Sequence, residues 1–210
     1  MSFFFPPECL QCGKEDFWIC KECLNKIILE KSPPPYHLEY FEKVFVCSGW
    51  ENMLIQSAVK KIKFEFATGI LDDVQPLFEK RIREWDIQKD AIFVPVPLHF
   101  LRKNERGFNQ SALLAKIFSE IFCGEIKVYE LIKRTRNTPH QSHLSKEDRK
   151  ENIASAFLLN TKIAQKISPL TPIILVDDVL TTGNTMMECA KVLKSHGYEK
   201  IWGMVVAHGK

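Results

Sequence analysis

Two adjacent carboxylates end an apolar run in residues 173–186, which read IILVDDVLTTGNTM. Four apolar residues bounded by polar ones are typical of a buried strand in a parallel sheet. Asp177 and Asp178 come directly after them, where open parallel sheets bind their ligands. Carboxylates at that position suit vicinal hydroxyls or a hydrated cation. The pattern therefore favours a ligand site over its alternative, a strand end with acidic caps.

A short hydroxyl-rich loop follows the aspartates and precedes a helical pattern over residues 186–195. The loop consists of Thr181, Thr182, Gly183, Asn184 and Thr185. Because a helix N-terminus presents unpaired N–H groups and the positive end of its dipole, a loop of small residues there can cradle a phosphate. Gly183 would allow the backbone to approach the anion, and Gly197 is the expected C-cap of the helix. A P-loop is excluded, since G-x-x-x-x-G-K-[ST] occurs nowhere in the chain.

Four of the seven cysteines lie close together near the start of the chain, with the spacing C-x₂-C-x₇-C-x₂-C. They are Cys9, Cys12, Cys20 and Cys23. Each C-x-x-C pair can place two thiolates on one side of a metal, and four thiolates complete a closed tetrahedral shell. The spacing therefore predicts a structural Zn²⁺. An iron site of the same geometry and a redox pair are the alternatives.

The cysteine cluster defines an expected zinc-binding module, residues 1–32, ahead of a larger domain, residues 36–210. The Ser-Pro-Pro-Pro run at residues 32–35 is a stiff, extended linker and marks the boundary. The module could clamp the N-terminus onto the larger domain. It could instead contact nucleic acid or a protein partner, with Phe17 and Trp18 as exposed aromatic side chains.

Strand and helix patterns alternate through the larger domain. Strand patterns cover residues 43–49, 91–96, 156–159, 173–176 and 201–207, and helical spacing covers residues 54–62, 70–82, 109–121 and 186–195. This alternation is typical of an α/β domain with a parallel sheet. In the first helix, Lys60, Lys61 and Lys63 fall mostly opposite the apolar face. We therefore expect these lysines to form a solvated face rather than a binding patch.

Two basic segments lie between the predicted strands, a loop at residues 99–107 and the polar stretch at residues 133–150. Their candidate anion-binding side chains are Arg102, Lys103 and Arg106 in the first, and Lys133, Arg134 and Arg136 in the second. The first loop follows a strand and could hold a diphosphate. A short helix is expected in the second, because Ser145 and Asp148 resemble a capping box.

The composition is that of a globular protein with one main core and a small appendage, at 45% hydrophobic and 26% charged residues. The net charge of +3 permits a polyanionic partner without requiring one. No run approaches the roughly 18 to 20 apolar residues of a membrane span, and the start of the chain lacks the features of a signal peptide. We therefore expect a cytoplasmic protein.

Residues 173–186 closely resemble the phosphoribosyl pyrophosphate (PRPP) motif of type I phosphoribosyltransferases. The resemblance implies a phosphoribosyltransferase-like fold for the larger domain. It also implies that Asp177 and Asp178 contact the ribose hydroxyls as the catalytic pair, and that the loop at residues 181–185 holds the 5′-phosphate. Mg²⁺ would accompany PRPP, and the basic side chains Arg102, Lys103, Arg106 and Arg134 would face its diphosphate.

The order of features along nearly the whole chain resembles the ComF family of competence proteins. These features are the paired C-x-x-C, the sequence PVPL, the sequence RGFNQ at residues 106–110, a basic segment and the PRPP motif. The resemblance implies a role in natural transformation, in which imported single-stranded DNA reaches the cytoplasm. Lys133, Arg134 and Arg136 are then candidate DNA contacts, and a translocation helicase or an inner-membrane channel is a candidate partner. The protein would work at the inner face of the membrane.

Two kinds of function follow from these resemblances. The first is a binding protein that engages incoming single-stranded DNA and binds PRPP or a similar phosphosugar. The second is an active phosphoribosyltransferase, in which Mg²⁺ and the basic segments neutralise the departing diphosphate while the aspartates anchor the ribose. Its acceptor is unidentified, because no residue of the sequence selects a base. A purely structural zinc adaptor is a third alternative.

Overall fold

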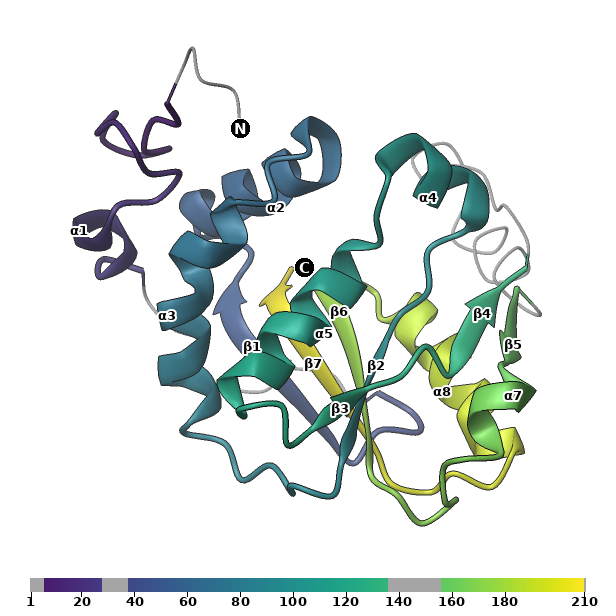
Figure 1. Cartoon of the computed structure of the whole chain (residues 1–210). Coiled ribbons are helices and arrows are strands. Elements are labelled where there is room, and N and C mark those ends of the chain that lie inside the picture. Colours follow the sequence, from purple (N-terminus) through teal and green to yellow (C-terminus); the bar gives the residue numbers. More distant parts are fainter. Residues whose placement is uncertain (1–5, 28–37, 136–155, 210) are drawn as a thin grey trace.

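A five-stranded parallel sheet forms the centre of the protein in the computed structural model, which describes residues 6–27, 38–135 and 156–209 (Figure 1). In order across the sheet, the strands are β1 (Lys43–Gly49), β7 (Ile201–His208), β6 (Ile173–Leu180), β2 (Ile92–Pro95) and β3 (Lys127–Val128). All four neighbouring pairs are parallel. The α/β class and the parallel sheet expected from the sequence are confirmed.

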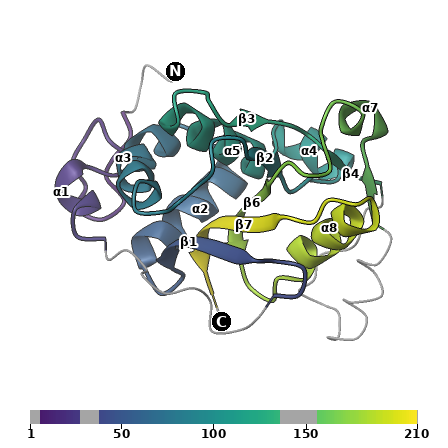
Figure 2. The same cartoon turned by 90° about the horizontal axis from the view of Figure 1, so that it is seen from below.

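Helices cover both faces of the sheet, so that the chain forms three layers (Figure 2). One face carries α2 (Met53–Glu65), α3 (Ile70–Ile82) and α5 (Gln110–Ile121). The other carries α8 (Asn184–Ser195) and an antiparallel pair, β4 (Ile132–Arg134) with β5 (Phe157–Leu159), and the short helix α7 (Thr161–Ala164) follows β5. Along β6, Ile174 and Val176 face the first layer while Ile173 and Leu175 face the second. Burial on both faces explains why this strand is apolar throughout rather than alternating.

Local sequence signals account for the helices that flank the sheet. The apolar residues of α2 recur at helical spacing and are buried. Its N-terminus is capped by Asn52, whose side chain accepts hydrogen bonds from the N–H groups of Leu54 and Ile55 at 3.1 and 3.2 Å. Asn109 caps α5 by accepting from the N–H of Ser111 at 3.1 Å, as the sequence predicted. The C-cap of α8 is His196 rather than the expected Gly197, which comes directly after it with a positive φ of 87°.

Three local expectations differ from the structure. The basic loop at residues 99–107 is in fact a helix, α4 (Phe100–Arg106), because its Leu, Arg, Lys and Glu residues are good helix formers and Gly107 ends it at φ 77°. The strand expected at residues 173–176 continues to Leu180, because β6 pairs with β7 as far as His208. The strand near residue 157 pairs with β4, outside the main sheet. The expected linker at residues 32–35 and the short helix near Ser145 lie outside the described residues.

The four-cysteine segment, with its short helix α1 (Lys21–Leu24), packs against α2 and α3. Ile19, buried to 2% exposure, belongs to the same apolar cluster as the helices. The carboxylate of Asp73 on α3 accepts hydrogen bonds from the N–H groups of Trp18 and Ile19 at 2.7 and 3.0 Å. Trp18 is partly buried rather than exposed as predicted, because it packs against α2, while Phe17 remains exposed. These contacts favour the interpretation of the segment as a clamp.

Replacing Asp73 should loosen this clamp. We expect Asp73→Ala to lower the free energy of unfolding by ~1–3 kcal/mol, because two partly buried N–H groups lose an ionised acceptor. Thermal or denaturant unfolding of the zinc-loaded protein would measure the change. Asp72→Ala is the matched control, since Asp72 is exposed and lies in the same first turn of α3. Equal losses in the two variants would contradict the assigned contact.

Candidate functional site

A pocket opens at the carboxyl ends of β2 and β6, which are neighbours in the sheet. The helix α5, which follows β2 and the short α4, packs on one face of the sheet, whereas the helix after β6, α8, packs on the other. The loops of the two strands therefore separate and leave a crevice, which is the usual ligand site of open parallel sheets. The crevice has a volume of about 330 Å³. Its polar and aromatic lining consists of Trp50, Lys63, Arg102, Asn109, Gln110, Ser111, Arg134, Asp177, Asp178, Thr181 and Thr185.

The segment that joins α4 to α5, residues 106–110 with the sequence RGFNQ, contributes Asn109 and Gln110 to the wall of this pocket. The side chain of Asn109 caps α5 and also donates to the carbonyl of Val96 at 3.0 Å, which fixes the helix to the end of β2. The guanidinium of Arg106 donates to the side-chain carbonyl of Gln110 at 2.6 Å. Gly107 supplies the left-handed conformation of the turn. The turn thus aims α5 and its first residues at the pocket.

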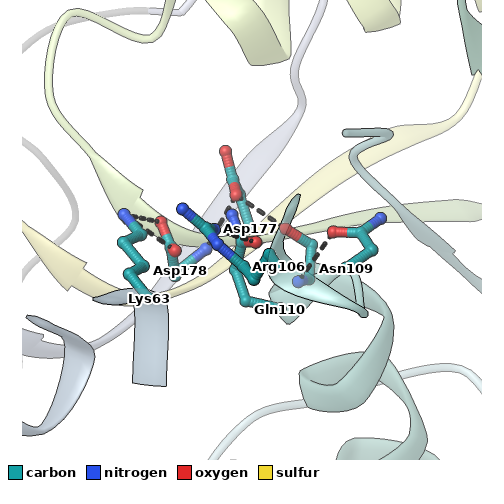
Figure 3. A network of polar contacts seen from close by, with 7 residues as sticks. Lys63, Arg106, Asn109, Gln110, Asp177 and Asp178 are labelled. Carbon is teal, nitrogen blue, oxygen red and sulfur yellow. Dashed lines mark hydrogen bonds and ion pairs between the residues drawn. The ribbon is translucent and has the colours of Figure 1, made fainter. Parts of the chain in front are cut away.

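The two aspartates of β6 occupy different surroundings, because consecutive residues of a strand point to opposite faces (Figure 3). Asp178 is buried, and Lys63 of α2 lies 2.9 Å from its Oδ1 and 2.8 Å from its Oδ2. Oδ1 of Asp177 accepts a hydrogen bond from the hydroxyl of Ser111 at 2.9 Å and another from the N–H of Asp178 at 2.9 Å. Each acid is therefore held in place by a different helix.

The environment of Asp177 makes its ionisation unfavourable. Burial raises the pKa of this carboxyl to about 7, and the neighbouring negative charge of Asp178 acts in the same direction. The charge of Lys63 and the hydrogen bond from Ser111 lower the pKa, but they compensate only in part. A carboxyl poised near neutral pH at the bottom of a crevice is typical of ligand sites.

The hydroxyl-rich loop lies where the sequence placed it, although α8 begins inside it, at Asn184. Thr181 and Thr185 line the pocket, whereas Thr182 is exposed and is not part of the lining. Gly183 is the N-cap of α8 with φ 75°. A Cβ at this position would lie 2.7 Å from the side chain of Leu38, so both conformation and space require glycine.

The predicted basic residues divide into three groups. Arg102 and Arg134 line the pocket, and Lys133 lines an adjoining hollow of about 210 Å³ that Arg134 shares. Burial lowers the pKa of the Arg134 guanidinium, and the positive charge of Arg102 lowers it further. Arg106 is turned toward Gln110 (Figure 3). The side chain of Lys103 and all of Arg136 lie outside the described part of the chain.

Sequence reasoning missed several residues of the pocket. Lys63 was expected in solvent but is bound to Asp178, so that expectation is wrong for this lysine. Its partner is 115 positions away in the chain, and helical spacing alone does not reveal such a contact. Ser111 and Trp50 were also missed. The only available signal for Ser111 was its place in the first turn of a helix that follows a pocket-forming strand.

The four cysteines converge on one point, with all four Sγ atoms within 4.8 Å of one another. A tetrahedral Zn²⁺ with Zn–S bonds of about 2.3 Å requires sulfur atoms about 3.8 Å apart, so the cluster could hold zinc. Burial raises the pKa of Cys9, but backbone N–H groups, that of Cys20 above all, outweigh this effect and lower it to about 6. Gly13, with φ 74°, forms the tight turn after the first pair by donating its N–H to the carbonyl of Cys9 at 2.9 Å.

The fold and the pocket define an α/β protein with a crevice at a switch point of its parallel sheet and a four-cysteine cluster that could hold a metal ion. No protein-family model matches the chain. Competence protein F of Haemophilus influenzae is 28% identical over 207 residues, covering 96% of this chain and 85% of that protein. The DNA utilization protein YhgH of Salmonella typhi is 38% identical over 196 residues, covering 90% and 78%, and competence protein ComFC of Bacillus subtilis is 28% identical over 146 residues, covering 70% and 56%. The chain belongs to the ComF family of competence proteins.

Among the described residues, no helix has both the length and the apolar character needed to cross a bilayer.

The raised pKa of Asp177 predicts a pH-dependent effect of its replacement. Between about pH 4 and pH 7 the folded protein retains a proton that the unfolded chain, with a pKa of about 3.9, has lost. This carboxyl therefore makes the free energy of unfolding fall as the pH rises through that window. We expect Asp177→Asn to stabilise the protein by ~1–3 kcal/mol at pH 8 and by much less at pH 5, measured by thermal unfolding. The exposed Asp90→Asn should show no such difference, and a gain independent of pH would contradict the assignment.

Proposed function

We propose that this protein binds PRPP or a related phosphosugar in the switch-point pocket and engages single-stranded DNA during DNA uptake. The observation that carries the proposal is the lining of the pocket, which brings two carboxylates, two threonine hydroxyls and two guanidinium groups around one crevice of about 330 Å³. These three kinds of group match the hydroxyls, the phosphate and the diphosphate of such a ligand.

The acidic side of the pocket suits the sugar. Asp177 and Asp178 are fixed by Ser111 and Lys63, so their positions are set before a ligand arrives. Vicinal hydroxyls donate well to preorganised carboxylates. Mg²⁺ would be held chiefly by the phosphate oxygens of the ligand and by water, as this ion usually is.

The basic side of the pocket suits the phosphates. The charge of Arg102 lowers the pKa of Arg134, which means that the two cations repel each other in the described structure. A diphosphate between them would replace that repulsion with two attractive, charge-assisted interactions. The 5′-phosphate would bind to Thr181, Thr185 and the N-terminus of α8.

The proposed role with DNA draws on the relatives and on the surface beside the pocket. The related proteins are named for competence and for DNA utilization. The hollow lined by Lys133 and Arg134 adjoins the pocket and shares Asn109, Pro97 and Arg134 with it. Phosphates of a single strand could follow these cations across the carboxyl end of the sheet.

Calorimetric titration of Mg²⁺ and PRPP into the zinc-loaded protein tests the ligand. At pH 8, above the raised pKa of Asp177, we expect binding by the parent and a loss of at least ~10-fold in the Asp177→Asn, Asp178→Asn double variant, because both hydroxyl acceptors lose their charge. Asp90→Asn should bind as the parent does. If a folded parent shows no heat of binding, the assigned ligand is wrong. Diphosphate release in the presence of a nucleobase would identify the protein as an active phosphoribosyltransferase.

Fluorescence anisotropy with a labelled single-stranded oligonucleotide tests the DNA surface. We expect Lys133→Ala with Arg134→Ala to weaken binding and to reduce the slope of log affinity against log salt by roughly 1.4, since about two phosphate contacts of about 0.7 each disappear. The matched control is Lys166→Ala with Lys200→Ala, which removes two exposed cations that precede β6 and β7. Equal effects of the two pairs would show that only net charge matters.

A further inference from the structure

An exposed group of aromatic side chains lies beside the pocket, at the end of α2 and in the turn after α4. Phe64 and Phe66 keep 63% and 54% of their surface exposed. The ring of Phe66 meets the ring of Phe108 edge-on, with centroids 6.3 Å apart. The guanidinium of Arg106 lies over the ring of Phe64, 5.9 Å from its centroid. We call these four residues the aromatic patch.

The conformation of Phe66 indicates that packing is not the reason for this patch. Phe66 is the C-cap of α2 and has φ 58°, in the left-handed region where glycine is usual. A bulky residue in that region destabilises the fold, and an exposed phenylalanine ring gains little from burial. Side chains that are kept in an unfavourable conformation while exposed are enriched at functional sites.

The aromatic patch continues the wall of the pocket on both sides. Phe64 follows Lys63, which is bound to Asp178, and Phe108 precedes Asn109, which lines the crevice. Arg106 is held toward the pocket by its hydrogen bond to Gln110 (Figure 3). The helices that carry these residues, α2 and α4, stand on either side of the carboxyl end of the sheet (Figure 1). A ligand with phosphates near the pocket would therefore meet exposed rings at its rim.

We propose that the aromatic patch stacks the bases of single-stranded DNA, while the cations at the pocket hold the neighbouring phosphates. This inference rests on the proposed function, to which it adds the surface that contacts the bases. Aromatic rings interleaved with cations suit a single strand, because every base has a π-face and each lies next to a phosphate. The bases of a duplex are already stacked on one another and would not be available to these rings. The patch therefore provides a preference for single strands that cationic side chains alone would not.

The test compares a labelled oligothymidylate with an abasic oligonucleotide of the same length, by anisotropy with the full-length, zinc-loaded protein. We expect the parent to bind the thymidylate more tightly. We expect Phe64→Ala with Phe66→Gly to bind the thymidylate ~10-fold more weakly or worse, and to bind the abasic strand as the parent does. Glycine fits the left-handed cap at position 66, so the melting temperature should not fall. Leu170→Ala is the control, since this side chain is 77% exposed outside the patch.

Three other results of this comparison would contradict the inference. Thymidylate affinity unchanged in the double variant would overturn the inference, while leaving the proposed DNA function standing. Equal affinity of the parent for the two strands would also overturn it, because phosphates alone would then account for binding. If the parent binds neither strand at low salt, the DNA part of the proposed function fails together with the inference.

Discussion

The parallel pairing of β2 with β6 is the constraint on which the site depends. These two strands lie side by side, yet the helices that follow them pack on opposite faces of the sheet. No continuous loop layer can then cover the carboxyl ends, and a crevice must remain. The polar side chains that line this crevice come from several segments around the sheet. The acids come from β6, the two threonines from the loop after β6 and the start of α8, Ser111 from α5, Lys63 from α2, and the two arginines from α4 and β4. Backbone pairing sets the positions of the strand ends, and the side chains of Ser111 and Lys63 then fix the two acids.

The sequence predicted what depends on local pattern and missed what depends on distant contacts. Apolar periodicity placed α2, α3, α5 and α8, and the acidic pair and the cysteine spacing pointed to the two sites. The basic content of residues 99–107 was mistaken for a sign of a loop, although charged residues with long side chains also form good helices. Lys63 could not be identified, since nothing near it in the chain indicates an acid 115 positions away.

The four-cysteine segment and the pocket are joined through α2. Lys61 lies over the ring of Trp18, 5.7 Å from its centroid, and Lys63, half a turn further along the same helix, binds Asp178. The indole of Trp18 also covers Gly69, where a Cβ would lie 3.3 Å from its Nε1. The four-cysteine segment thus stabilises the C-terminal end of α2, the helix whose Lys63 binds Asp178. A metal that folds this segment would stabilise the pocket without touching it.

The position of β1 in the sheet has a consequence for synthesis on the ribosome. β1 pairs with β7, so that Lys43 lies opposite Trp202. At synthesis rates of about 5–20 residues per second, roughly 10–30 s separate the emergence of these two strands. During that interval β1 has no partner for its hydrogen-bonding edge, and the apolar faces of α2 and α3 have only part of the sheet to cover. The nascent chain therefore passes through a stage in which aggregation competes with folding, and chaperones that shield unpaired strands would raise the yield of native protein.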